Sequence, residues 1–313
     1  MPELSIICPL LNEKEFIPKL VDSLLCDDGL DKELLFVDGG STDGSREEIK
    51  KLSVTDSRIK LVNNPKKYVN FGFNAAFEQS SGEFVAFLGA HTKYPPGYLK
   101  LAVDAIRNEE CDAAGGPLNQ VGRSTMGKAI AYCLGSKFGV GNTEFRVYKK
   151  RMYVDSVAFA VYKREIFERI GLLDEDLVKN QDDEFHYRLN KAGYRILMIP
   201  EMESTYYVRD SLSGLIRQYF NYGLFKPLVL KKIGKVVSIR HFIPTMFVLY
   251  LLSFPLLNLS YLWFIPLLLY LVLDLVFSLK AKGGILTKLY SLIVFPVLHI
   301  SYGLGFLLGL TKS

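Results

Sequence analysis

The chain has 313 residues and a formal net charge of +5, and 49% of its residues are hydrophobic. That length predicts one large domain plus an additional segment, and the modest charge gives no indication of a nucleic-acid partner. The four cysteines, Cys8, Cys26, Cys111 and Cys133, lack the spacing of a metal site, and nothing in their pattern demands disulfides. We expect buried thiols in a reducing compartment. Residues 4–10 are too short an apolar run for a signal peptide and lack its basic flank.

Short apolar runs alternate with helical patterns as far as residue 116. Strands are expected at residues 4–8, 33–37, 59–62, 84–88 and 112–116, with helices between them at 13–25, 42–51, 70–79 and 96–108. This alternation is typical of an α/β fold and predicts a mostly parallel sheet with helices on both faces. Residues 117–240 are more mixed, with strands expected at 156–162 and 195–199 and helices at 164–170, 182–192 and 211–230. The last helix is amphipathic, as expected at a membrane surface.

The most informative segment is residues 33–45, where an apolar run stops at Asp38 and is followed by glycines, hydroxyls and a second carboxylate. The run reads as a buried strand, and the next residues as a helix capped by Ser41 or Thr42. Asp38 therefore lies at the carboxyl end of a strand, where α/β sheets bind ligands. It is suited to accept a hydrogen bond from a base or a ribose hydroxyl. The alternative is that Asp38 only caps the following helix.

Three other segments are expected to join Asp38, because the carboxyl ends of parallel strands share one edge of a sheet. They are residues 9–13, residues 87–91 and residues 180–188. In the last of these, Asp182, Asp183 and Glu184 begin a helix, where carboxylates favourably meet the helix dipole. Arg188 follows Glu184 by four residues, which is also an ordinary helix pair. We favour a functional site, one that activates a substrate group, over this purely structural interpretation.

Taken together, these motifs resemble the family 2 glycosyltransferases with a GT-A fold, over roughly residues 4–225. Pro9 with Asn12 and Glu13 resembles the nucleotide-binding first loop of that family. Asp38 and Gly39, within residues 37–44, resemble its base-and-ribose loop.

The later part of the same resemblance concerns the diphosphate and acceptor. Asn74 and the pair at residues 82–83 match the helix and strand leading to the diphosphate site. Residues 181–184 with Arg188 are similar to the acceptor-side acidic motif, which implies that Asp182 is the general base; Gln181 replaces the customary Glu. Residues that the resemblance places at the acceptor or diphosphate are Asp183, Glu184, Arg188, Arg209, Arg217 and Gln218. Residues 89–95, 154–159 and 217–223 resemble the succinoglycan-type subgroup, which builds exopolysaccharide units on lipid carriers.

One departure from the family concerns metal binding. The family usually presents Asp-x-Asp where this chain has Gly89, Ala90 and His91, of which Ala90 and His91 are expected to contact the donor. Mg²⁺ and Mn²⁺ prefer oxygen ligands, so dependence on either ion is in doubt. His91 is then a metal ligand, a hydrogen-bond donor to a phosphate or a structural residue. A basic residue, such as Lys93, Arg209 or Arg217, is an alternative partner for the leaving diphosphate.

The C-terminal part turns strongly apolar. We expect a catalytic domain at residues 1–210, an interfacial segment at 211–240 and a transmembrane region at 241–313, with helices at 242–258, 261–279 and 289–310. Lysines before the first and between the second and third helices favour a cytoplasmic catalytic domain. A pair of buried core helices is the alternative.

The sequence thus predicts a multi-pass cell-membrane enzyme, an inverting glycosyltransferase. It would move a sugar from a nucleotide-diphosphate donor, most plausibly a UDP-sugar, to a lipid-linked saccharide in glycan biosynthesis. Three alternatives stay open: transfer onto a polyprenyl phosphate, a catalytically weakened nucleotide-sugar-binding assembly subunit, and a transporter component. The missing carboxylates at 89 and 91 motivate the second of these.

Overall fold

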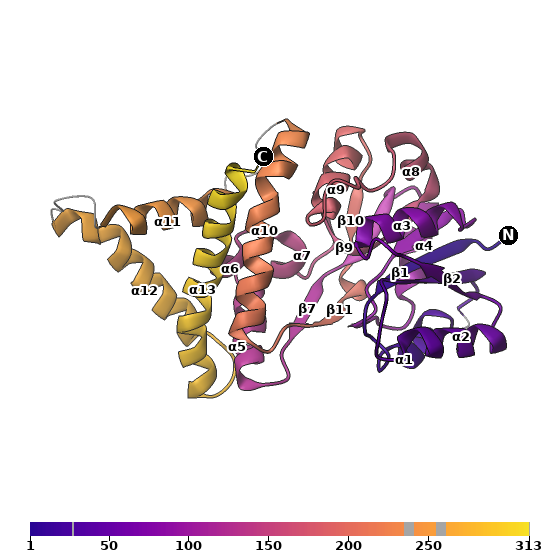
Figure 1. Cartoon of the computed structure of the whole chain (residues 1–313), viewed down its shortest axis with the longest axis horizontal. Helices are drawn as coiled ribbons and strands as arrows, with labels where there is room; N and C mark the ends of the chain where they lie inside the picture. Colours follow the sequence, from indigo (N-terminus) through magenta and orange to yellow (C-terminus); the bar gives the residue numbers. More distant parts are fainter. Residues whose placement is uncertain (27, 235–240, 255–260, 313) are drawn as a thin grey trace. The chain divides into compact units, whose positions relative to one another are not determined.

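The computed structural model describes residues 1–26, 28–234, 241–254 and 261–312, which belong to two compact units. The first unit is Met1–Asn119 with Tyr148–Tyr206, and the second is Gln120–Val147 with Tyr207–Ser313. In Figure 1 the C-terminal helices of the second unit are orange and yellow, whereas its residues 120–147 have the magenta of the middle of the chain. The grouping of 120–147 with the C-terminal helices has no counterpart in the sequence-based domain boundaries.

The first unit contains an eight-stranded sheet in the order β3-β2-β1-β4-β9-β6-β10-β8. Its strands are β1 (Leu4–Leu10), β2 (Lys32–Asp38), β3 (Ile59–Asn63), β4 (Phe84–Phe87), β6 (Ala113–Gly116), β8 (Met152–Val154), β9 (Ala158–Lys163) and β10 (Ile196–Met198). The pairs among β1 to β4 and the β6–β10 pair are parallel, whereas β9 runs antiparallel to β4 and β6, and β8 to β10. The predicted α/β fold with a mostly parallel sheet is confirmed.

Helices cover both faces of this sheet. On one face α1 (Ile17–Leu24), α2 (Ser45–Thr55) and α4 (Tyr98–Arg107) enclose a core cluster with alternate residues of β1, β2 and β4. On the other face lie α3 (Val69–Glu78), α8 (Arg164–Ile170) and α9 (Gln181–Lys191). There the Phe73 ring lies 4.8 Å from Phe87 of β4 and 5.3 Å from Phe167, and Phe167 stacks at 4.7 Å on Phe185. Figure 1 shows α1 and α2 on the opposite side of β1 and β2 from α3.

A shorter sheet has the order β5-β11-β7, formed by β5 (Thr92–Lys93), β11 (Ser204–Tyr207) and β7 (Leu118–Val121). Within the first unit, β5 and β11 pair antiparallel through Tyr206 opposite Thr92. This pairing anchors the segment that follows β4.

The start of the second helix differs from the sequence-based expectation. Helix α2 begins at Ser45 and its N-cap is Gly44, with φ 90°, so the predicted cap at Ser41 or Thr42 is wrong. A left-handed cap position favours glycine, and it frees the preceding hydroxyls for contacts elsewhere.

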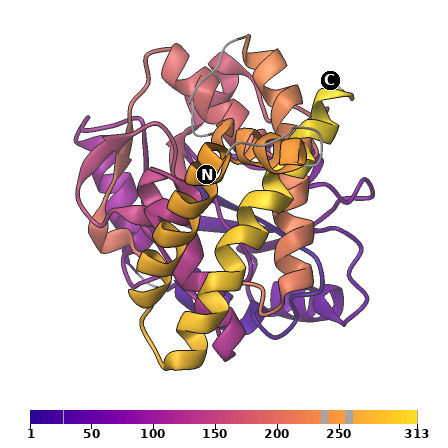
Figure 2. The ribbon, with the colours of Figure 1, turned by 90° about the vertical axis from the view of Figure 1, so that its left-hand side faces the viewer.

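The second unit is helical. Its helices are α5 (Thr125–Leu134), α6 (Lys137–Val140), α7 (Glu144–Val147), α10 (Leu212–Ile233), α11 (Ile243–Ser253), α12 (Ile265–Leu279) and α13 (Ile285–Leu310). Helices α10 and α13 lie side by side (Figure 2). A Cβ on Gly223 would lie 2.1 Å from the Tyr302 carbonyl oxygen, and one on Gly305 2.1 Å from that of Phe220. The two helix backbones therefore approach as closely as only glycine permits.

Two segments of this unit are long and apolar enough to cross a bilayer, judged by length and composition: Tyr261–Leu279 and Ile285–Leu310. They coincide with the second and third expected spans, although α13 starts four residues before 289. The first expected span, 242–258, is described only to residue 254, and α11 within it has 11 residues. The described part of the predicted interfacial segment forms α10.

Candidate active site

The loops after β1 and β2 are joined by hydrogen bonds at the carboxyl edge of the sheet. The Asn12 backbone N–H donates to Ser41 Oγ at 2.9 Å, and the Thr42 N–H donates to Asn12 Oδ1 at 2.8 Å. The Glu13 N–H donates to Ser45 Oγ at 3.0 Å. The hydroxyls that the sequence assigned to a helix cap thus tie the second loop to the first, and the two loops form one surface.

Asp38 ends β2 directly opposite Leu10 of β1 and is almost fully buried. Its Oδ1 accepts from the Ser41 N–H at 2.9 Å and its Oδ2 from Arg46 Nη1 at 3.2 Å. Burial raises the pKa of this carboxyl, but the hydrogen bonds from Ser41 and Arg46 outweigh it and leave the pKa below its ordinary value. Asp38 is therefore a held carboxylate that also shapes the turn, and its contact with a nucleoside stays a prediction.

Pro9 and Gly39 lie beside this carboxylate. Pro9 is paired with Val37 within the parallel β1–β2 ladder. The Gly39 N–H donates to the Leu10 carbonyl at 3.0 Å, and a Cβ on Gly39 would lie 3.4 Å from that same oxygen. The second loop therefore crosses close over the end of β1.

The segment after β4 reaches the same edge. His91 Nδ1 lies 3.0 Å from Glu13 Oε1, and the imidazole ring lies 5.2 Å from the Tyr206 ring. The His91 side chain is 38% exposed and that of Glu13 19%. Ala90, which precedes His91, is buried. Three of the four predicted segments, those containing Glu13, Asp38 and His91, are therefore linked by side-chain hydrogen bonds.

Gly89 occupies a position where a carboxylate side chain does not fit. A Cβ there would lie 2.8 Å from the Phe159 ring. The Tyr94 hydroxyl accepts from the Gly89 N–H at 2.8 Å and donates to its carbonyl at 3.1 Å. The Tyr98 hydroxyl donates to the Phe159 carbonyl at 2.6 Å and holds Phe159 in a left-handed conformation, φ 55°. Sequence reasoning gave no sign that Phe159 fills this space.

The residues present do not form a protein-held metal cage. Among the residues described by the structure, no group of three or more His, Cys, Asp or Glu side chains is placed to hold an ion. Glu13 and His91 offer one carboxylate and one imidazole, and divalent hard cations take about six oxygen-rich ligands.

The fourth segment forms the start of α9. Asp182 is exposed in the first helical turn, after Asn180 in a left-handed conformation with φ 60°. Buried behind it, the Tyr162 hydroxyl lies 2.8 Å from His186 Nε2. Burial lowers the pKa of His186 to about 4 even though the charge of Asp183 opposes this. Asp182 therefore faces outward from a neutral, buried support.

Glu184 and Arg188 form the ordinary helix pair considered above. Arg188 Nε donates to Glu184 Oε1 at 2.7 Å and Nη2 to Oε2 at 2.9 Å, a two-pronged contact in which Glu184 is buried. Arg188 also donates to the Leu172 carbonyl at 2.7 Å. This pairing leaves Asp182 and Asp183 as the outward-facing acids of the cluster.

Asn74 is directed toward the loop before α9. Its Nδ2 donates to the Leu173 carbonyl at 2.9 Å and to Glu175 Oε1 at 3.2 Å, and its Oδ1 accepts from the Leu173 N–H at 3.1 Å. Asn70, which sequence reasoning did not single out, binds the same loop. The two are four residues apart on α3, and that spacing on one helix face is the only signal that the sequence offers.

The remaining predicted residues belong to the second unit. Arg209 and Arg217 are exposed, and Gln218 Nε2 donates to the Tyr222 hydroxyl at 3.1 Å. Their contact with an acceptor or a diphosphate stays a prediction.

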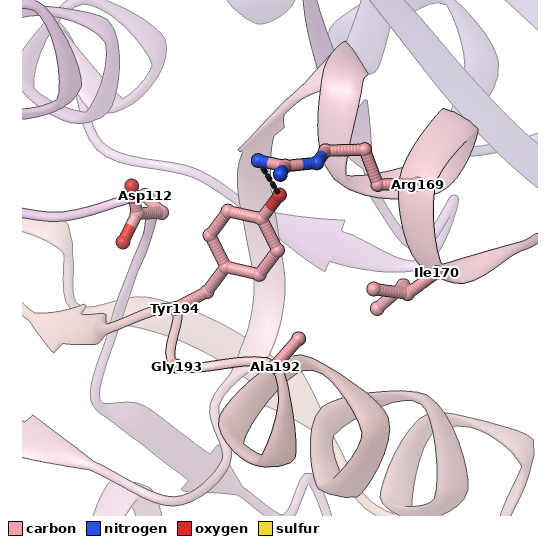
Figure 3. Close-up of a pocket in the computed structure, with 6 residues that line it drawn as sticks. All are labelled: Asp112, Arg169, Ile170, Ala192, Gly193 and Tyr194. Carbon is pink, nitrogen blue, oxygen red and sulfur yellow. Dashed lines mark hydrogen bonds between the residues drawn. The ribbon is translucent and has the colours of Figure 1, made fainter.

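A separate hollow of about 360 Å³ opens at the amino ends of β6 and β10, away from these loops (Figure 3). It is lined by Asp112, Arg169, Ile170, Ala192, Gly193 and Tyr194. Arg169 Nη1 donates to the Tyr194 hydroxyl at 3.2 Å, and the Asp112 carboxylate accepts from the Arg195 N–H at 2.9 Å. Because its polar groups bind one another, the loops at the carboxyl edge are the better candidate.

A parallel-stranded core with linked loops at its carboxyl edge and an acidic helix start defines a glycosyltransferase domain of the GT-A fold. The mannosyltransferase PcManGT of Pyrobaculum calidifontis, solved with GDP-Man and Mn²⁺, aligns with a TM-score of 0.62 at 19% identity, covering 95% of this chain and 86% of that one. GalNAc-T7, solved with UDP, GalNAc and Mn²⁺, aligns with a TM-score of 0.54 at 13% identity, covering 73% and 51%. These likenesses show the fold.

The family follows from the sequence comparisons. The model of the family described as "Glycosyl transferase family 2" matches residues 5–171. The chain is 32% identical over 242 residues to the succinoglycan biosynthesis protein ExoA of Rhizobium meliloti, covering 76% of this chain and 73% of that protein. The chain belongs to glycosyl transferase family 2 and is a glycosyltransferase of glycan biosynthesis, as the resemblance implied.

A second relative by sequence comes from Methanococcus voltae. It is the dolichyl N-acetyl-alpha-D-glucosaminyl phosphate 3-beta-D-2,3-diacetamido-2,3-dideoxy-beta-D-glucuronosyltransferase, 30% identical over 239 residues, covering 73% of this chain and 74% of that protein. Its name describes transfer to a sugar carried on a lipid phosphate.

Proposed function

We propose that this glycosyltransferase is membrane-anchored and inverting, and that it moves a sugar from a UDP-sugar to a lipid-linked saccharide. The observation that carries the proposal is the linked surface formed by Asn12, Glu13, Asp38 and His91. It is supported by the acidic start of α9 in the same unit. Two relatives are named for transfer to lipid-linked sugars, the M. voltae enzyme and a Campylobacter jejuni GalNAc(5)-diNAcBac-PP-undecaprenol glucosyltransferase that is 37% identical over 90 residues.

In this proposal the donor lies across the linked loops, with Asp38 and Gly39 at the nucleoside and Ala90 and His91 toward the diphosphate. Asp182 takes the proton of an acceptor hydroxyl as that oxygen attacks the anomeric carbon. The bond from the anomeric carbon to the phosphate oxygen breaks, and the nucleoside diphosphate leaves from the opposite face. This single displacement inverts the configuration and requires no enzyme nucleophile.

In this proposal the positive charge that stabilises the leaving diphosphate comes from basic side chains. His91 and Lys93 lie in the segment after β4, and Lys93 is exposed. Arg209 and Arg217 are the further basic candidates. An ion that binds the donor phosphates would add to this charge.

The membrane part of the proposal rests on α12 and α13. The segment Tyr261–Leu279 is 11% buried, and most of its leucines and valines are exposed. Lys280 and Lys282 lie between the two helices and Lys288 lies in the first turn of α13, and lysines flanking a span favour the cytoplasmic side. We therefore place the first unit in the cytoplasm, beside a lipid-linked acceptor.

Radiolabelled transfer tests the proposal. Membranes containing the full chain are incubated with a panel of labelled nucleotide sugars, and the lipid fraction is compared with that from the Asp182→Asn variant. The expected result is a labelled lipid-linked saccharide, formed from a UDP-sugar and lost in the variant. A labelled sugar monophospholipid would instead support transfer onto a polyprenyl phosphate.

A subunit that binds the nucleotide sugar without turnover is the second candidate. Gly89 favours this function, because the Phe159 ring lies where the family usually has a carboxylate side chain. UDP binding in the absence of transfer from every donor would support that function.

A further inference from the structure

The loop that leads into α9 is held by side chains rather than by a regular ladder of backbone hydrogen bonds. From α3, Asn70 Nδ2 donates to the Asp174 carbonyl at 2.9 Å and to the Leu177 carbonyl at 3.1 Å. Asn74 binds both backbone groups of Leu173. Asn70 is fully buried and Asn74 is 8% exposed, so these bonds are shielded from water.

The same loop is held from α9 itself. The guanidinium of Arg188 donates to the carbonyls of Ile170, Gly171 and Leu172, while Glu184 fixes its orientation. The carbonyls of residues 170–174 and 177 thus accept hydrogen bonds from three side chains, which lie on two helices. Backbone polar groups that lack partners are costly to bury, so the conformation of the loop depends on these contacts.

We propose that Asn74 and Asn70 are positioning residues for the acceptor side, in place of the donor contact expected for Asn74. The inference rests on the proposed role of Asp182, the second residue of α9, which follows Leu177 by five residues. The Asn74 amide uses its oxygen and its nitrogen on the loop, and could not turn to a donor without releasing Leu173. Its removal therefore shifts Asp182 and leaves the donor loops joined.

Hydrogen exchange and nucleotide binding separate the two roles for Asn74. The variants are Asn74→Ala and Asn70→Ala in the full chain. Gln79→Ala is the matched control, because Gln79 carries an exposed amide on the same stretch of chain whose Nε2 bonds only the Ala75 carbonyl, within its own helix. Amide exchange is followed over residues 170–180, and UDP affinity is measured by calorimetry, with GDP as the alternative nucleotide.

Positioning predicts faster exchange at Leu173 and a turnover about 10–100-fold lower, since a misplacement of about 1 Å is that costly. It also predicts unchanged nucleotide affinity and a control like wild type. A loss of nucleotide affinity with unchanged exchange would make Asn74 a donor ligand and overturn the proposal, as would unchanged exchange and turnover. If Asp182→Asn keeps full activity, the proposed base is wrong. The exchange result still reports whether Asn70 and Asn74 hold the loop before α9.

A compensating pair covers the case in which the alanine variants fail to fold. Asn74→Asp keeps the acceptor for the Leu173 N–H but places a carboxylate about 3.2 Å from Glu175 Oε1. Glu175→Gln supplies an amide donor to that carboxylate. Positioning predicts that turnover falls in N74D and partly recovers in N74D/E175Q, with UDP affinity constant throughout. No recovery, together with a weakened UDP affinity, would contradict it.

Discussion

The donor loops and the start of α9 are held in different ways. The donor loops are tied to each other across the sheet edge, through short side chains such as Asn12 and Ser41. The start of α9 is fixed from behind, through the loop that Asn70, Asn74 and Arg188 hold. Asp182 itself is exposed in the first turn of α9, directly after that loop.

This difference separates binding from chemistry. A change among the donor loops alters the surface that we propose for the nucleotide, and contacts there should act equally on the bound substrate and on the transition state. A change behind α9 alters the placement of one carboxylate and should appear in turnover. The following substitutions test that separation, beginning with the largest expected effect.

Asp182→Asn should lower turnover by about 10²–10⁴-fold, because it keeps the side-chain volume and removes the proposed general base. UDP affinity and thermal stability should stay near wild type, since Asp182 is exposed in the first turn of α9. Steady-state kinetics and calorimetry measure both. Asp183→Asn is the matched control, and a loss confined to that variant would move the base by one residue.

The pH dependence of stability tests the buried support of α9. The pKa of His186 is lowered to about 4 in the folded protein by burial, from 6.5 in an ordinary environment. Above pH 6.5 the imidazole is neutral in both states and contributes no pH dependence. As the pH falls from about 6.5 to about 4, the unfolded chain takes up a proton that the folded protein resists, so the free energy of unfolding decreases.

Denaturant unfolding at several pH values measures this decrease. His186→Phe should remove that part of the pH dependence, although it also costs a constant amount by releasing the Tyr162 hydroxyl. An identical pH slope in the two proteins would show that His186 is not the group responsible.

Gly89→Asp should destabilise the fold by about 1–3 kcal/mol, the usual cost of overpacking. The added Cβ would lie 2.8 Å from the Phe159 ring, which the Tyr98 hydroxyl holds in place. Thermal unfolding measures the change, and a Phe159→Ala background supplies the control. The aspartate should cost less in that background, and an equal cost would mean that Phe159 is not what excludes a carboxylate here.

Local patterns sufficed for the parts of the site that lie close in sequence to strand ends. Alternation of apolar runs and turns placed Asp38 and the loop containing Asn12 at the carboxyl edge. The helix cap was misplaced because Ser41 and Thr42 are of the residue types common at a cap, whereas the helix is capped by Gly44 in a left-handed conformation.

Contacts between distant parts of the chain were beyond the reach of those patterns. Asn74 and Leu173 are 99 residues apart in the sequence, and no local signal joins them. Phe159 reaches Gly89 across 70 residues in the same way. The packing of 120–147 with the C-terminal helices likewise depends on tertiary contacts, such as the Tyr132 hydroxyl donating to the Phe277 carbonyl at 2.6 Å.

Asp38→Ala should weaken UDP affinity by about tenfold, the loss expected for one hydrogen bond to a charged group. The apparent donor KM should rise more than turnover falls, since a contact with the base or ribose acts in ground and transition states alike. Calorimetry with UDP checks the affinity, and Arg46→Ala controls for the loss of the ion pair alone. Equal UDP affinity in wild type and Asp38→Ala would leave Asp38 with only its role in the turn.

The smallest effect is expected at His91, whose side chain is 38% exposed and bonds Glu13. A single hydrogen bond between partly exposed side chains contributes little, so His91→Ala should change donor affinity by only about two- to fivefold. His91→Asp distinguishes the two functional roles. As a metal ligand, the position keeps or improves its response to Mn²⁺ with a carboxylate, because that ion prefers oxygen. If His91 instead donates a hydrogen bond to a phosphate, His91→Asp loses nucleotide binding through repulsion between the carboxylate and the diphosphate.

UDP titrations with and without Mn²⁺ give the comparison, and Glu13→Gln reports whether the neighbouring carboxylate is needed for either response. If His91→Ala matches wild type at every Mn²⁺ concentration, the ring serves only to pack between the first loop and Tyr206.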